Sequence, residues 1–575
     1  MAAWPSSESL DIILNTPMST YCVSYGLTFI PYSEALAQPW PTLRDLLHRP
    51  DPRSHPVCIA RQLLRLALLI RGLASETLQD LSRRLTTNAT DIMALAFEVA
   101  TRYVTTNGEL SGTIEAIECI MMEAMFQNNS GQIRLAFMAS RRALVAGQML
   151  GLDRGPKSPL IRLLDPATLD RINPEYMWLR IVQMDMYLSM QLGLPQGAAE
   201  NTFTTDAAML PPFERLERSL AIVGGRIIRR NCTARDDLEL TGEIDEIMSN
   251  HYSIMPPQWW LSPDMSSRGQ DERTLLRETN RFMLQLTHFH MLEQLHLPFL
   301  LSPSGSIYDY HKLTGVHASR EVLTRYVAFR SAMPPTATFC RGIDFLAFSA
   351  STVICLGHMD ARLRQSCPKT GGVGRDKSSA VSKCLAHHHS SDRGILEQTL
   401  ACLEAAAQER PSDPISKKVS RGLRHLLAVE ADVANGMAYK VEPAYQDNDE
   451  RDELGWKGEL HTEHAMLQVH IPHLGSIKIK PHGQAATVAG FQEPARQDVT
   501  EPALQTLNAP SRGCFPSRDG QPEDQVPASC NQSNGVFLET DTDGDFRFNL
   551  DDFQEEPWFM PTFMFGDDWA QPSFG

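Results

Sequence analysis

The chain has 575 residues, of which 42% are hydrophobic and 21% are charged, and this composition is typical of a globular protein with a large core. Its net charge of −16 makes the general surface unfavourable for nucleic acid, so a role at DNA would need a local basic patch. The eleven cysteines contain no CxxC pair, which favours reduced thiols in an intracellular compartment over a disulfide framework.

The sequence contains no predicted membrane or secretion segment. Residues 1–13 lack the basic and apolar regions of a signal peptide. The uncharged, strongly apolar run 345–359 is shorter than the ~20 residues that a membrane helix needs, and Asp344 and Asp360 bracket it. We therefore expect a buried core helix there and no membrane partner.

The predicted elements define an all-α protein with a multi-helix regulatory domain. Residues 1–57 form a polar, Pro-rich N-terminal segment with a short apolar stretch at 10–14. Helical periodicity then dominates residues 58–436, and we expect one large helical domain over this range. Its main helices are predicted at 58–74, 91–103, 113–127, 174–192, 271–297, 319–330, 342–363, 395–408 and 415–435.

Residues 118–154 contain two helical patterns that meet at a polar turn at 128–131. In the second pattern, apolar and small residues recur at steps of three and four and predict one buried stripe, with Arg141 and Arg142 outside it. Gly151 stands where a left-handed residue ends a helix, and Leu152 can then pack back on that helix. The pattern predicts an antiparallel αα-hairpin. A tetratricopeptide array is disfavoured because no repeat of that period recurs.

Two stretches interrupt the helical patterns. Residues 366–392 are rich in Gly, Ser and Lys and indicate a loop insertion. Residues 437–536 indicate a mostly disordered linker, because seven prolines and many polar residues fall between 481 and 535. Alternating apolar residues at 467–479 predict a short strand region inside this linker.

Residues 537–575 form an acidic-aromatic tail. They hold ten acidic residues and one basic residue, Arg547, which leaves a net side-chain charge of −9, and they also hold ten aromatic residues. This mixture is typical of an activation domain whose aromatics dock on coactivators. The alternative is that Trp558, Phe559 and Met560 pack back on the helical core. Both interpretations can hold together, because a docked tail would be a masked activator. The predicted activation surface comprises Phe546, Phe548, Asp551, Asp552, Phe553, Trp558, Phe559, Asp567, Asp568 and Trp569.

Several blocks within residues 8–480 resemble, in the expected order, the middle regulatory domain of fungal zinc-cluster transcription factors. The helical pair carries Arg141-Arg142-Ala143, Gln148 and Gly151-Leu152-Asp153-Arg154. Further blocks read Leu192-Gly193-Leu194-Pro195-Gln196-Gly197 and Leu295-His296-Leu297-Pro298-Phe299. We call the following set the signature residues: Arg141, Arg142, Gly151, Leu152, Arg154, Pro195 and Pro298.

The resemblance implies a nuclear transcriptional regulator, namely a pathway-specific activator of a biosynthetic (secondary-metabolite) gene cluster that acts through the RNA polymerase II machinery and transcriptional coactivators. It leaves a homodimer and a small-molecule effector open. Members of this family begin with six cysteines that hold two zinc ions, whereas Cys22 and Cys58 are the only cysteines here before residue 119. We therefore expect no cofactor in this chain, zinc only in a preceding segment, and DNA contact only through such a segment or a partner protein.

Two other functions compete with this interpretation. The first is a non-DNA-binding coregulator without the zinc cluster, and the second is a helical protein-interaction scaffold unrelated to transcription. The sequence has no GxSxG, no GxGxxG after a strand and no nucleophile with a credible base, so we predict that the protein is not an enzyme. Cys384 with His387-His388-His389 is interpreted as a solvated run, not a metal site, and His288, His290 and His296 as core or interface histidines.

Overall fold

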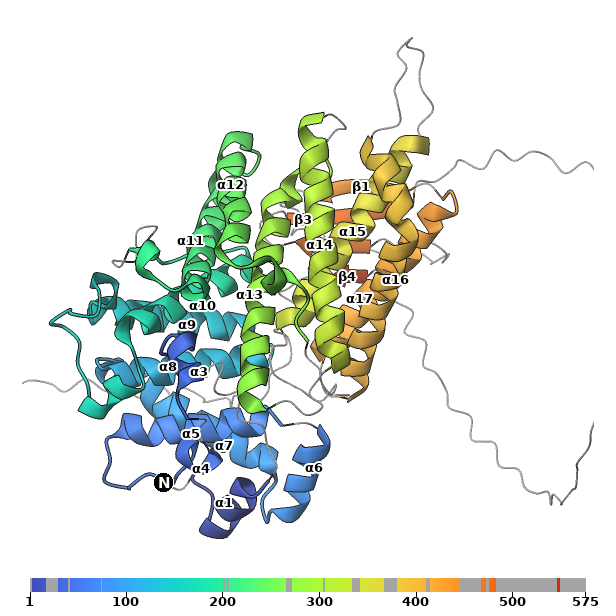
Figure 1. Ribbon diagram of the computed structural model, residues 1–575. Helices are drawn as coiled ribbons and strands as arrows, with labels where there is room; N and C mark the ends of the chain where they lie inside the picture. The colour runs from blue at the N-terminus through green and yellow to red at the C-terminus, as the bar shows by residue number, and fades with distance from the viewer. Residues whose placement is uncertain are drawn as a thin grey trace, which may run out of the picture.

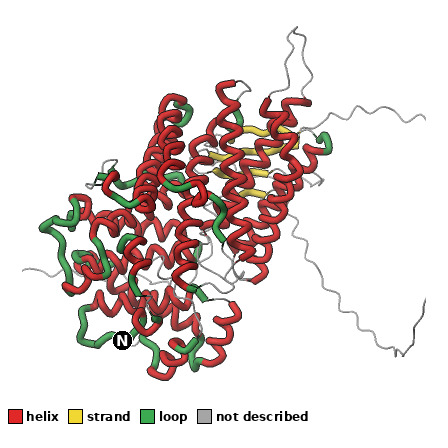
Figure 2. The backbone as a smooth tube through the Cα atoms, viewed as in Figure 1, coloured by secondary structure: helices red, strands yellow, loops and turns green. Residues whose placement is uncertain are grey.

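The architecture is given by a computed structural model of the chain. It describes residues 3–444 apart from 17–28, 40–41, 74, 200–202, 204–205, 265–270, 303–305, 333–341, 367–379, 410–413 and 438, and also residues 467–471, 475–481 and 546–548. The described part is helical, with one small sheet at one end (Figures 1 and 2). The predicted all-α fold class is thus confirmed, with the sheet as an addition.

Most of the N-terminal helices form one apolar cluster around α5. They are α1 (Ser7–Leu14), α4 (Leu43–Leu46), α5 (Pro56–Arg71), α6 (Ser75–Arg84), α7 (Ala89–Ala100), the π-helix η1 (Thr101–Thr105), η2 (Gly108–Leu110) and α8 (Ile114–Asn129). The short helix α3 (Tyr32–Ala37) instead buries Tyr32 in a neighbouring cluster. Ile13 of α1 and Leu47 after α4 are buried in the same cluster as Leu64 of α5. The segment 1–57, expected only as polar and Pro-rich, therefore supplies helices and core side chains, because its few apolar residues are the ones that turn inward.

The middle of the chain extends the stack of helices. Its elements are α9 (Ile133–Met149), η3 (Leu152–Arg154), η4 (Pro166–Asp170), α10 (Pro174–Leu192), η5 (Ala207–Met209), α11 (Pro212–Thr233), α12 (Leu238–Ile254), η6 (Pro257–Trp260), α13 (Glu272–His296) and η7 (Leu297–Phe299). Local signals set the bounds of α10: the Asn173 side chain accepts hydrogen bonds from the N–H groups of Glu175 and Tyr176, and Gly193 ends the helix at a φ of +66°. The charged helices α11 and α12 were not predicted.

Four long helices complete the helical part: α14 (Ser306–Ala332), α15 (Gly342–Ser366), α16 (Ala380–Glu409) and α17 (Pro414–Ala434). Among the described residues, α15 is the one helix whose length and hydropathy would suit a membrane, but 94% of its apolar window is buried in this core, as expected for a core helix. The predicted loop 366–392 is partly wrong. Its second half belongs to α16, where Asp392 pairs with Arg320 of α14 and supports the helix despite its polar composition.

A four-stranded sheet follows α17 and closes one end of the core. Its strands are β1 (Tyr439–Ala444), β2 (Leu467–Ile471), β3 (Gly475–Pro481) and β4 (Phe546–Phe548), in the order β1-β3-β2-β4. β3 pairs antiparallel with β1 and β2, and β4 pairs in parallel with β2. Val469, Ile477 and Ile479 are buried in the same apolar cluster as α13 to α17. The structure has β2 and β3 where alternation predicts a strand region, whereas β1 and β4 were not predicted within the linker and the tail.

Candidate functional site

The predicted activation surface lies mostly outside the described residues. Of its ten members, Phe546 and Phe548 belong to β4, which pairs with Leu467 to Val469 of β2. The other eight, Asp551, Asp552, Phe553, Trp558, Phe559, Asp567, Asp568 and Trp569, fall outside the part of the chain that the structure describes. The start of the acidic-aromatic tail is therefore attached to the sheet of the helical domain.

The signature residues Arg141 and Pro195 meet in one site. Arg141 of α9 pairs with the fully buried Asp185 of α10 at 2.8 Å, and it also donates to the backbone carbonyl of Pro195. The N–H of Gly197 donates to the second oxygen of Asp185 at 2.8 Å. Burial raises the pKa of the Asp185 carboxyl, while Gly197 and Arg141 oppose that shift. Arg141 thus fastens the loop after α10 onto α9, and a side chain at Gly197 would collide with it.

Arg142, the residue after Arg141, contacts a different helix. Its guanidinium pairs with Glu123 of α8 at 2.7 Å, and Gln127 donates to the same carboxylate oxygen at 3.1 Å. Glu123 is almost fully buried, so the pair links the two helices of the hairpin below its surface. The predicted αα-hairpin is confirmed, and its two arginines point to different neighbours.

Gly151 ends α9 as predicted from its position. Its φ of +66° lies in the left-handed region, and a Cβ added there would approach the hydroxyl of Ser158 to 2.4 Å. Leu152 is 1% exposed and packs in the cluster of α8, α9 and α10. Arg154 ends the short turn η3, and Pro298 lies in η7, directly after α13. These signature residues end helices and shape the turns that follow them.

A buried carboxylate hub on α8 was missed by the sequence analysis. Glu118 is 1% exposed and lies 3.8 Å from Arg61, 3.2 Å from Arg65 and 2.8 Å from Arg171. Burial alone would raise the pKa of Glu118, but the three arginines outweigh it and lower this pKa. The available signal was the pair Arg61 and Arg65, which stand one turn apart on the otherwise apolar α5.

Two buried histidine pairs line α13. Nδ1 of His288 lies 3.3 Å from Nδ1 of His251 on α12, and Nδ1 of His296 lies 2.8 Å from Nδ1 of His311 on α14. Asp245 accepts from His296 at 3.3 Å. Desolvation lowers the pKa of His251 to about 4, and the same effect lowers the pKa of His311 to about 4. The expectation of core histidines is confirmed, since His288, His290 and His296 are all buried.

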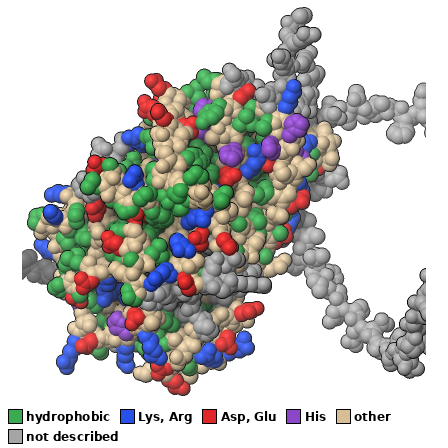
Figure 3. Space-filling model, in the orientation of Figure 1, with side chains coloured by type: hydrophobic (Ala, Val, Ile, Leu, Met, Phe, Trp, Pro, Cys, Tyr) green, Lys and Arg blue, Asp and Glu red, His purple; other side chains and the backbone are tan. Residues whose placement is uncertain are grey.

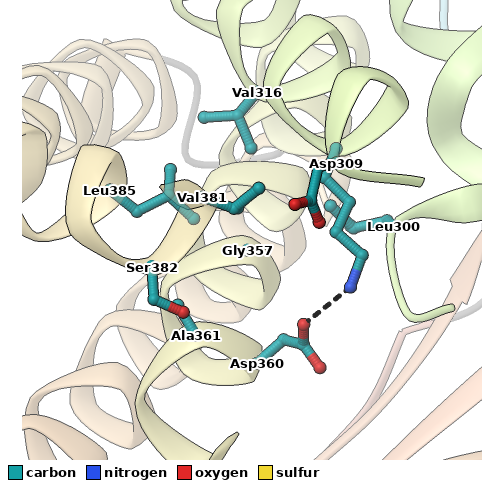
Figure 4. Close-up of a pocket in the computed structure, with 10 residues that line it drawn as sticks. Leu300, Asp309, Val316, Gly357, Asp360, Ala361, Val381, Ser382 and Leu385 are labelled. Atoms are coloured by element: carbon teal, nitrogen blue, oxygen red, sulfur yellow. Dashed lines mark hydrogen bonds and ion pairs between the residues drawn. The ribbon is translucent and has the colours of Figure 1, made fainter. Parts of the chain in front are cut away.

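A small cavity lies between α14, α15 and α16 (Figure 4). Lys312 and Asp360 pair across one side of it at 3.0 Å, while Leu300, Val316 and Leu385 line the apolar side. Its volume of about 10 Å³ is space for roughly one water molecule, so a metabolite would require the helices to separate. This cavity is therefore too small, in this arrangement of the helices, for the small-molecule effector that the sequence left open.

The described residues do not fit the zinc cluster of the resembling family. Their cysteines stand singly, and within this part of the chain no group of three His, Cys, Asp or Glu side chains could hold a metal. Burial raises the pKa of the Cys119 thiol well above its usual value, which disfavours the thiolate that zinc requires. In the histidine run, His387 and His388 are exposed as predicted, whereas His389 pairs with Glu430 of α17 at 2.8 Å.

Charged side chains of both signs are scattered between apolar ones on the face in Figure 3, without one dominant basic area. Carboxylates of the fold itself pair with Arg141, Arg171 and His296. Their arrangement can hold helices together and transmit a change in one interface to the next.

Comparison with curated proteins identifies the family. The chain is 32% identical over 519 residues to the dehydrocurvularin biosynthesis regulator of Aspergillus terreus. The matched region covers 88% of this chain and 68% of that protein. A regulator of the same name from Alternaria cinerariae is also 32% identical, over 83% of this chain and 60% of the relative. Transcription factor sdnS of Sordaria araneosa is 31% identical, over 62% of this chain and 46% of the relative.

The chain belongs to this family of fungal transcription factors and biosynthesis regulators. The predicted function, transcriptional regulation in fungal secondary metabolism, is thereby confirmed. These relatives are named as regulators and not as enzymes. The chain spans between about half and two thirds of their length. No family model and no solved structure matches it.

Proposed function

We propose that this chain is the regulatory and activating part of a pathway-specific activator of one biosynthetic gene cluster, and that it works in the nucleus. Support comes from its relatives, which are named as biosynthesis regulators and transcription factors. The observation that carries the activating role is the tail 537–575, with ten acidic and ten aromatic residues attached to the domain at β4.

In this account the tail recruits coactivators of the RNA polymerase II machinery. Its carboxylates repel one another and keep the segment extended, so that aromatic side chains such as Trp558 and Phe559 reach a shallow groove on the coactivator. The affinity is modest and exchange is fast, because binding orders only a short segment. The helical domain acts as the platform that presents the tail.

DNA contact is assigned to a zinc cluster in a segment beyond this chain or to a partner protein. The described cysteines do not fit such a cluster, and the net charge of −16 opposes binding of a phosphate backbone by the general surface. No step of the activation mechanism within this chain uses zinc. A zinc-cluster origin of the domain rests on the resemblance of its signature residues.

A tethered reporter tests the activating role. Residues 537–575 fused to a heterologous DNA-binding domain should activate transcription, and replacing Phe553, Trp558, Phe559 and Trp569 with Ala should abolish that activity. The matched control replaces Thr540, Thr542, Gln554 and Gln571 with Ala. It leaves the charge and the aromatic side chains of the fragment unchanged, so its activity should be unchanged. Equal activity of the aromatic variant and the neutral variant would refute docking by the aromatic side chains.

The competing function is a coregulator that reaches DNA only through another protein. A partner would supply the basic DNA contacts that the net charge of −16 disfavours on the general surface of this chain. Native protein purified from the fungus and mixed with promoter DNA separates the two functions. An activator with its own zinc cluster binds alone, whereas a coregulator binds only after a DNA-binding partner is added. The scaffold unrelated to transcription is disfavoured by the family assignment.

A further inference from the structure

Helix α9 leaves an apolar face uncovered. Leu135, Met138, Val145 and Met149 are 51%, 56%, 54% and 70% exposed. Steps of three, seven and four residues separate them, so they follow one side of the helix like the a and d positions of a coiled coil. The other sides of α9 pack on α8 and α10 (Figure 1). We call these four side chains the α9 seam.

The α9 seam lies on a basic helix. Between Ile133 and Met149 the sequence has three arginines and no acidic residue, which gives a side-chain charge of +3. Arg142 occupies the seam position between Met138 and Val145, and its side chain is 34% exposed although it pairs with Glu123. Because Arg141 and Arg142 already pair with the buried carboxylates of Asp185 and Glu123, the seam selects its occupant mainly by apolar contact.

The area of the seam argues against a second copy of this chain. Four half-exposed side chains along one helix offer on the order of 300–400 Å², which is the size of a functional surface patch. A stable complex buries about 800 Å² on each partner, roughly twice as much. Symmetric pairing of two α9 helices would also place Arg142 against its own copy. A short segment that is tethered to the same domain fits this area better.

The chain supplies such a segment after β4. Residues 549–575 contain six acidic residues, no Lys or Arg, and seven aromatic residues. Pairing of β4 with β2 fixes the start of this segment on the domain. Its 27 residues span up to about 90 Å when extended, and tethering gives an effective concentration on the order of millimolar. Even a weak contact would then be occupied.

We propose that residues 549–575 dock their aromatic side chains on the α9 seam. Docking covers Leu135, Met138, Val145 and Met149 with aromatic side chains. Its regulatory consequence rests on the proposed activating function of the tail: the same aromatics cannot bind a coactivator while they cover α9. A coactivator or a change in the domain must then displace the tail before activation.

Photo-crosslinking of the full chain tests the contact itself. Benzoylphenylalanine at position 138 should crosslink to peptides from residues 549–575 of the same molecule, and Val145→Asp should remove these crosslinks. The same probe at position 209, where Met209 on η5 is 80% exposed, is the matched control and should not reach the tail. An equimolar mixture with isotope-labelled chain separates contacts within one chain from contacts between chains. Crosslinks only between chains, or none to the tail, would overturn the proposal.

A reporter assay then tests the consequence. In the full chain fused to a heterologous DNA-binding domain, Met138→Asp should raise transcription by about tenfold, whereas Met209→Asp should leave it unchanged. Circular dichroism of both variants checks that they fold. An inactive isolated tail refutes the proposed function but leaves the crosslinking result valid. An active tail, combined with no crosslink and no increase for Met138→Asp, refutes docking alone.

Discussion

Removing the charge of Glu118 should destabilise the N-terminal half of the protein. Glu118→Gln preserves the shape of the side chain, but it leaves Arg61, Arg65 and Arg171 without their shared carboxylate. These three side chains are 18%, 13% and 33% exposed, so water screens the uncompensated charges only in part. Removing one partner of a buried ion pair typically costs 3–5 kcal/mol. Because Arg171 is a third exposed, we expect the lower end, about 3 kcal/mol.

Hydrogen exchange localises this loss better than a global unfolding curve, because a chain of this size need not unfold in two states. Glu118→Gln should lower the protection of backbone amides in α5 and α8, which the hub joins. Asp80→Asn is the matched control. Asp80 pairs with Arg84 on the surface at 3.4 Å, and its loss should cost no more than about 0.5 kcal/mol. A cost below about 1 kcal/mol for Glu118→Gln would refute the assignment of the hub as a stabilising element.

The hub also predicts a pH dependence with a definite sign. The folded pKa of Glu118 lies below its usual value, so the unfolded state takes up a proton first as the pH falls. The contribution of Glu118 is therefore complete above about pH 4.5 and is lost as the pH falls through the folded pKa. Glu118→Gln should remove this part of the acid sensitivity of α5 and α8.

Three further predictions concern the other networks. Gly151→Ala should cost about 1–2 kcal/mol in thermal or urea unfolding because of its positive φ, whereas Gly72→Ala, at a φ of −77° that ends α5, should be nearly neutral. The free energy of unfolding should fall by about 3 kcal/mol as the pH falls from 6.5 toward the folded pKa of His251, about 4, because only the unfolded state binds a proton at His251 in this range. Hydrogen exchange of α12 across this pH range measures the loss, and a protection that does not change with pH would contradict the prediction. Arg141→Ala should expose the loop that contains Pro195 to limited proteolysis, and unchanged cleavage would contradict its fastening role.

The sequence predicts most long helices because their apolar residues recur with helical spacing and their ends carry local signals. The spacing in α9 and the glycine after it are examples, and both agree with the structure. The short helices of residues 1–57 escape prediction because packing on α5, not local periodicity, stabilises them. The first half of α16 was missed for a similar reason: its histidines and serines look like a loop until Asp392 and His389 meet partners on α14 and α17.

The signature residues were identified from the sequence, but their roles were not. Arg141 and Arg142 are adjacent, and no local pattern indicates that one binds Asp185 on α10 and the other Glu123 on α8. Buried networks such as the Glu118 hub join residues more than fifty positions apart, so their partners follow from the packing of helices. The sequence does not predict the exposed apolar face of α9 either, because the helical spacing of its apolar residues indicates only the stripe that packs inward.

The transcript profile of the native fungus after deletion of this gene tests the central claim most directly. The account predicts that the genes of one contiguous biosynthetic cluster lose expression together, and that restoring the full gene recovers them. Restoration with the four tail aromatics replaced by Ala should fail to recover them. Unchanged expression of every biosynthetic cluster under conditions in which the gene is transcribed would contradict the role of a pathway-specific activator.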